Sequence, residues 1–287
     1  MSVIHKIFPE KPFSFSRLNR YVAIRKGVKV LKRSDKTFYY WCDRHSTRGV
    51  DISIENDYIE VRNTVLSNRP DYELTNILTT NILSFTNGAI INENDEKCSP
   101  IVWNNESITK QEITDCEVIH LLSREEEIAI FGPIRDVFFG GRLYNKFKTF
   151  KGEQLRDNMF ALILQINYNL PKYDDCHIML VGKTDDDQNK MIVLSNDTDC
   201  IIGRYDKIML YTSGDPIMIT NEILNTILPI RWSLIDEYTI IAPVLDQSDW
   251  NKLLFDAHKH DQWYSFIVSP RPTTPPFLWV QDNLLQQ

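Results

Sequence analysis

The stretch from Val50 to Asn94, VDISIENDYIEVRNTVLSNRPDYELTNILTTNILSFTNGAIINEN, holds more mutually consistent structural signals than any other part of the chain. Apolar and polar residues alternate over residues 51–55 and again over 58–62, a period typical of half-buried strands. Asn56 and Asp57, between the two runs, tolerate the positive φ angles of a two-residue hairpin turn. The start of the stretch therefore predicts a β-hairpin.

From Asp71 to Phe85 the period changes to that of a helix, and Leu74, Ile77, Leu78, Ile82 and Phe85 fall on one face. Asp71 and Glu73 place negative charge in the first turn, where the helix dipole favours it. Asn87-Gly88 supplies a left-handed stop, and Ile90-Ile91 begins another strand. The whole stretch thus predicts a small α+β unit.

Further helices are expected at Gln154–Asn169 and Ser248–Lys259, where apolar residues follow a helical spacing, and Ser107–Ser123 is compatible with a helix although its apolar residues are only loosely periodic. Between the last two, short apolar runs are separated by turns that contain Asp, Asn and Gly, which predicts strands. Few of the connections are long enough to be helical crossovers, so we expect an α+β fold with mainly antiparallel sheets and about four helices.

We expect two packed subdomains with a boundary near residues 105–115. The segments are an N-terminal α+β subdomain, a C-terminal α+β subdomain with acidic turns, and a Pro-rich extended arm: residues 1–108, 109–262 and 263–287, respectively.

The composition restricts the class of protein. The chain has 287 residues, of which 43% are apolar, enough for a sizeable core. No run approaches the roughly 18 to 20 apolar residues that span a bilayer, and the first residues do not resemble a signal peptide. The five cysteines are widely spaced and odd in number, a pattern that does not resemble a secreted disulfide framework. We therefore expect a cytoplasmic protein with reduced thiols and no membrane partner.

One basic segment contrasts with the net charge of −7 for the whole chain. Residues 17–36 contain eight basic side chains and a single acid, Asp35. Arg25, Lys26 and Lys29 are candidate contacts for a partner. The plainer interpretation is a solvated face of strands. Another interpretation is nucleic-acid binding by residues 17–41, whose aromatic residues could stack on bases.

Acidic turns mark the second half of the chain. Asp185, Asp186 and Asp187 form one such turn and are candidate contacts for a basic partner. Asp197 and Asp199 follow an apolar strand and resemble the Asp-x-Asp motif of nucleotide-sugar glycosyltransferases. That resemblance implies a divalent cation held against a nucleotide diphosphate. The alternative is structural, because aspartate is common in turns.

The sequence lacks the commoner catalytic and metal-binding motifs. It has no G-x-S-x-G, H-E-x-x-H or Walker loop, and no CxxC knuckle. We therefore expect no cofactor and favour a non-enzymatic protein-binding function, of the immunity or antitoxin type or as an adaptor. The expected partner is another protein, and a basic one would suit the acidic turns. The alternative is a metal-dependent transferase or nuclease that uses Asp197 and Asp199.

Overall fold

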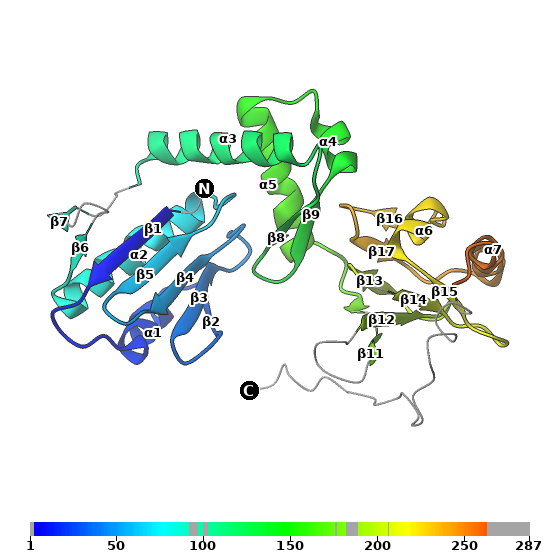
Figure 1. Cartoon of the computed structure of the whole chain (residues 1–287), viewed down its shortest axis with the longest axis horizontal. Coiled ribbons are helices and arrows are strands. Elements are labelled where there is room, and N and C mark those ends of the chain that lie inside the picture. Colours follow the sequence, from blue (N-terminus) through cyan, green and yellow to red (C-terminus); the bar gives the residue numbers. More distant parts are fainter. Residues whose placement is uncertain are drawn as a thin grey trace. The chain divides into compact units, whose positions relative to one another are not determined.

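The chain folds into two compact units, Met1–Asn169 and Leu170–Gln287. A computed structural model describes residues 3–91, 97–99, 103–175, 177–181, 189–205 and 207–262 (Figure 1). Within these ranges, no helix has both the length and the apolar character needed to cross a membrane. The Pro-rich arm expected at 263–287 lies outside the described residues.

The first unit is built on a seven-stranded antiparallel sheet with the order β2-β3-β4-β5-β1-β6-β7 (Figure 1). The expected hairpin is confirmed, with Asp51 opposite Arg62. The N-terminal strand β1 lies between β5 and β6, so the first residues of the chain complete the sheet. The strands are β1 (Val3–Phe8), β2 (Val28–Lys32), β3 (Thr37–Cys42), β4 (Val50–Ile54), β5 (Ile59–Asn63), β6 (Ala89–Ile91) and β7 (Lys97–Cys98).

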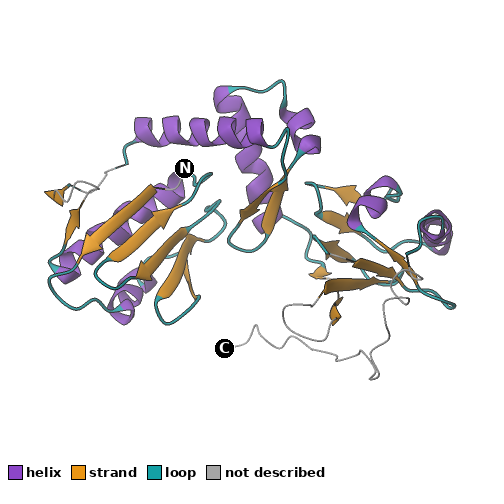
Figure 2. Ribbon diagram, viewed as in Figure 1, coloured by secondary structure: helices purple, strands orange, loops and turns teal. Residues whose placement is uncertain are grey.

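Two helices, α1 (Phe15–Ala23) and α2 (Arg69–Thr86), pack on one face of this sheet (Figure 2). The core joins Leu18 of α1 and Leu78 of α2 to Ile52 and Val61 of the strands, all fully buried. Alternation along each strand puts these apolar side chains on the helix-covered face. Asn87 ends α2 in the left-handed conformation, with φ of 52°, as the sequence predicted.

The remainder of the first unit consists of three helices and a hairpin. Helix α3 packs against α5, and the hairpin β8–β9 and α4 complete this part. Their bounds are α3 (Asn105–Leu122), β8 (Ile128–Phe131), β9 (Asp136–Phe139), α4 (Gly141–Phe147) and α5 (Gly152–Tyr168).

The second unit contains two four-stranded sheets, of order β10-β13-β17-β16 and β11-β12-β14-β15. The pairs β10–β13 and β12–β14 are parallel, and the other pairs are antiparallel. The strands are β10 (Asp174–Asp175), β11 (His177–Val181), β12 (Asn189–Leu194), β13 (Cys200–Ile202), β14 (Lys207–Leu210), β15 (Ile217–Ile219), β16 (Ser233–Leu234) and β17 (Ile240–Ala242).

Helices α6 (Asn221–Thr226) and α7 (Gln247–His258) belong to this unit. Trp250, Leu253 and Ala257 of α7 are buried, and they share a core with Trp232 and Ile240. Asp246 caps α7, because its side chain accepts a hydrogen bond from the Asp249 backbone N–H at 2.9 Å.

The α+β class is confirmed, but the expected number of about four helices is wrong, because the described residues contain seven. The four expected helices correspond to α2, α3, α5 and α7, and the sequence did not predict α1, α4 or α6. The suggested boundary near 105–115 overlaps α3, whereas the two compact units divide after Asn169.

Candidate functional site

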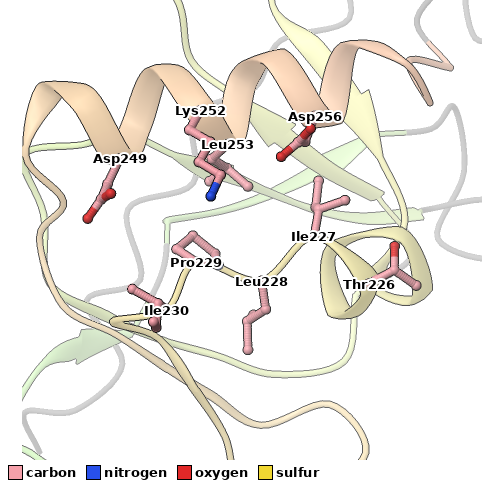
Figure 3. Close-up of a pocket in the computed structure, with 9 residues that line it drawn as sticks. All are labelled: Thr226, Ile227, Leu228, Pro229, Ile230, Asp249, Lys252, Leu253 and Asp256. Atoms are coloured by element: carbon pink, nitrogen blue, oxygen red, sulfur yellow. The ribbon is translucent and has the colours of Figure 1, made fainter.

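A groove in the second unit is the strongest candidate for a binding site. It has a volume of about 420 Å³ and lies between α7 and the segment that follows α6 (Figure 3). This volume is comparable to the roughly 300 to 1,000 Å³ of typical ligand pockets. Its lining residues are Thr226, Ile227, Leu228, Pro229, Ile230, Asp249, Lys252, Leu253 and Asp256.

The apolar wall of the groove is a short segment held in place by a turn. The Trp232 backbone N–H donates to the Pro229 carbonyl oxygen at 2.9 Å, which closes the turn. The buried Trp232 side chain anchors it, and the indole Nε1 donates to the Pro243 carbonyl oxygen at 2.9 Å. Ile230 therefore lies at the tip of a fixed turn, where its side chain is 95% exposed.

The opposite wall is a stripe of α7. Asp249, Lys252, Leu253 and Asp256 follow the i, i+3, i+4, i+7 spacing that puts side chains on one helical face. Leu253 is buried, whereas the two aspartates are half-buried and Lys252 is exposed. In Figure 3 the charged side chains project from α7 on the side of the Ile227–Ile230 segment.

The stripe carries charges of both signs: Asp249 and Asp256 are the acidic groups that could meet a cation, and Lys252 lies between them. Lys259 Nζ is 2.7 Å from Asp256 Oδ1, and this hydrogen bond lowers the pKa of Asp256. At neutral pH Asp256 is therefore ionised and retains one carboxylate oxygen free of this contact. An apolar wall beside two carboxylates suits an apolar side chain that is followed by a basic one.

The second unit as a whole carries an excess of negative charge. Residues 170–287 contain 17 acidic and nine basic side chains, a net charge of −8, so the first 169 residues carry +1. The excess negative charge of the protein thus belongs entirely to the unit that contains the groove. A field of this sign would attract a basic partner and accelerate its association at low ionic strength.

Asp197 and Asp199 lie on an exposed loop before β13. Asp197 Oδ1 accepts hydrogen bonds from the hydroxyls of Ser195 and Thr198, which lower its pKa. Asp199 Oδ1 accepts from the Val244 backbone N–H at 2.5 Å. Among the described residues there is no group of three or more His, Cys, Asp or Glu that could hold a metal ion.

The other predicted contacts fall in two places. Arg25, Lys26 and Lys29 are all exposed, on the turn after α1 and on β2. Asp185, Asp186 and Asp187 lie outside the described residues.

The sequence analysis did not predict the groove itself, although it correctly placed Asp249, Lys252 and Asp256 on a helix.

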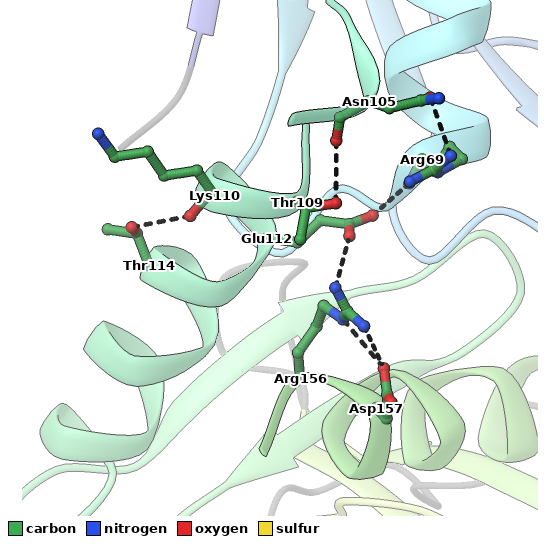
Figure 4. Close-up of polar contacts among 8 residues, drawn as sticks. All are labelled: Arg69, Asn105, Thr109, Lys110, Glu112, Thr114, Arg156 and Asp157. Atoms are coloured by element: carbon green, nitrogen blue, oxygen red, sulfur yellow. Dashed lines mark hydrogen bonds and ion pairs between the residues drawn. The ribbon is translucent and has the colours of Figure 1, made fainter. Parts of the chain in front are cut away.

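A second polar cluster, in the first unit, is structural in character. Glu112 of α3 accepts a hydrogen bond from the Arg69 backbone N–H at 2.6 Å and lies 3.7 Å from Arg156 of α5 (Figure 4). Arg156 also pairs with Asp157 at 2.8 Å. Burial raises the pKa of Glu112. These contacts connect the first turn of α2 to α3 and α5.

Comparison with known protein families, curated proteins and solved structures found no match for this chain. The geometry of the groove and the charge of its unit are therefore the observations that bear on function.

Proposed function

We propose that this chain is a protein-binding protein and that its second unit captures a basic, amphipathic segment of a partner in the groove between α7 and the segment that follows α6. The observation that carries the proposal is Ile230, an almost fully exposed apolar side chain on the rim of a groove that also contains Asp249 and Asp256. A protein of this kind would neutralise a basic toxin or serve as an adaptor.

The free energies of the two kinds of contact differ, and this difference distinguishes the roles of the apolar segment and of the aspartates in the groove. Burying an apolar side chain such as Ile230 contributes about 1.5 to 3 kcal/mol. An exposed ion pair contributes only about 0.2 to 1 kcal/mol. The Ile227–Ile230 segment therefore provides most of the affinity, while the two aspartates select a basic partner and increase the rate of association.

The alternative, a metal-dependent reaction at Asp197 and Asp199, lacks comparable support. Both carboxylates are exposed and hydrogen-bonded to nearby groups of their own unit. Nothing in this loop provides the converging oxygen ligands that a hard cation requires.

Copurification from the native host tests the proposal. The tagged chain is compared with the double variant Asp249→Asn/Ile230→Ser, which loses one negative charge and one exposed apolar group from the groove. The matched control is Asp215→Asn/Tyr211→Ser, which makes the same losses at exposed residues elsewhere in the unit.

We expect the wild type and the control variant to retain one specific partner, with more partner retained at low than at high salt. The groove variant should retain at least about tenfold less, as expected for a loss of about 1.4 kcal/mol or more. Equal retention by the two variants would refute binding at the groove. Thermal melting of both variants shows whether the second unit remains folded.

A further inference from the structure

The strand β2 forms an open edge of the sheet in the first unit. It is the first strand in the sheet order and pairs only with β3 among the described strands (Figure 1). Four of its five residues are exposed, including Val30 and Leu31, whose side chains are 37% and 50% exposed. An edge of this kind presents unpaired backbone groups to a further strand.

The register identifies which backbone groups point outward. Arg33 N–H donates to Thr37 O, and Asp43 N–H donates to Gly27 O. In an antiparallel ladder hydrogen-bonded pairs alternate with pairs that are not bonded to each other. Residues 27, 29, 31 and 33 therefore bond to β3, and the N–H and C=O groups of Val30 and Lys32 face away from the sheet.

The surroundings of this edge are strongly basic. Residues 25–36 contain six cationic side chains and one acid, Asp35. Asp35 pairs with Lys32 at 2.6 Å, and Asp51 of β4, two strands along the sheet, pairs with Arg33 at 2.7 Å. Lys29 is exposed and has no ion pair among the described residues. Two copies of β2 would place like charges side by side, which opposes self-pairing.

We propose that β2 accepts an extended acidic segment of another protein as an additional strand of the sheet. Backbone hydrogen bonds to Val30 and Lys32 would fix the segment, Val30 would contact its apolar side chains on one face of the sheet, and Lys29, on the other face, would select its carboxylates. This proposal is independent of the groove in the second unit.

A peptide interpretation fits this surface better than a nucleic-acid interpretation. Tyr39 and Tyr40 are buried, and Phe38 stacks on Phe15 at 4.1 Å between ring centroids. These rings therefore are not available as platforms on which bases could stack.

The test is titration of the full chain with the labelled peptide Glu-Val-Glu-Val-Glu-Val-Glu. Two further versions carry N-methyl groups on alternate amides, one on the valines and one on the glutamates, so that charge is unchanged. We expect saturable binding of the parent peptide, with one methylated version binding at least about tenfold more weakly and the other binding like the parent.

Two protein variants complete the test. Val30→Pro removes an outward N–H that β3 does not use, a position where an edge strand tolerates proline, and should weaken binding by a similar factor. Lys29→Glu should also weaken binding, whereas the control Lys110→Glu on α3 should not. Circular dichroism shows whether each variant is folded.

Three results would overturn the proposal. Equal binding of both methylated peptides and the parent would show attraction by charge alone. Tighter binding of a twelve-nucleotide oligothymidylate than of the peptide would assign the surface to nucleic acid. A dimer that Val30→Pro abolishes would show that the edge pairs with a second copy.

Discussion

His5 is the residue at which the stability of the first unit should respond to pH. Its side chain is 2% exposed on β1, and neither ring nitrogen has a hydrogen-bond partner among the described residues. Burial lowers the pKa of His5. The unfolded chain therefore binds a proton more readily than the folded chain once the pH falls below about 6.5.

We predict that the free energy of unfolding falls as the pH is lowered from about 7 to 5.5, by up to about 1.4 kcal/mol per pH unit below 6.5 from this residue. His5→Leu should remove that part of the slope, and the exposed His45→Gln should keep it. Urea denaturation at a series of pH values measures both, and identical slopes for His5→Leu and the wild type would contradict the prediction.

His5 and Ile230 show two reasons why the exposure of a single residue cannot be predicted from the sequence. His5 lies in Val3–Phe8, where Ile4 is 39% exposed and His5 is buried, so hydrophobicity does not report which face is inside. Ile230 is an ordinary apolar residue in the sequence, and only the turn closed by Pro229 and Trp232 leaves it exposed. The candidate site thus depends on tertiary contacts that no local pattern contains.

At the scale of elements, the sequence predicted the helices and hairpins whose signals lie within a short stretch of chain. The hairpin β4–β5 and the helix α2 follow from alternation, turn residues and capping. Helices α4 and α6 have seven and six residues, too few for a helical period to be distinguished. Helix α1 has nine residues, and its buried Phe15, Leu18 and Val22 do follow a helical spacing, which the sequence analysis did not use. The insertion of β1 between β5 and β6 is a non-local pairing, so the sequence could not place it.

The N-terminal turn of α2 organises the loops around it through one buried carboxylate. Asp71 accepts hydrogen bonds from the backbone N–H groups of Arg48, Gly49 and Asn68, at 3.0, 2.9 and 3.2 Å, and from the Thr47 hydroxyl at 3.2 Å. Burial raises the pKa of this fully buried carboxyl, and the hydrogen bonds act in the opposite direction. The turn between β3 and β4 is therefore fastened to α2.

We predict that Asp71→Ala destabilises the first unit by more than about 3 kcal/mol, because each buried donor left without an acceptor costs about 1 to 3 kcal/mol. Asp71→Asn keeps one carbonyl oxygen and should cost less. Hydrogen exchange of the amides at 46–49 measures the effect. Exchange in Asp71→Ala as slow as in the exposed control Asp57→Ala would show that this carboxylate does not hold the turn.

At the scale of the whole molecule, the two units differ in charge and in the surfaces they offer. The first carries +1 with a basic open strand edge, and the second carries −8 with a groove that contains two carboxylates. The sequence identified both the basic segment and the acidic second half, because charge is a property of composition. It could not show which of these charges flank exposed apolar groups, and that coincidence defines each proposed surface.

Site-specific photocrosslinking in the native host tests the central proposal, protein binding at the groove, most directly. A photoreactive phenylalanine replaces Ile230 in one version of the chain and Tyr211, which is 62% exposed outside the groove, in another. We predict one dominant crosslinked partner from position 230, none from position 211, and loss of the product when Asp249 and Asp256 are both changed to Lys. No crosslink at position 230, or the same products from both positions, would contradict the proposal.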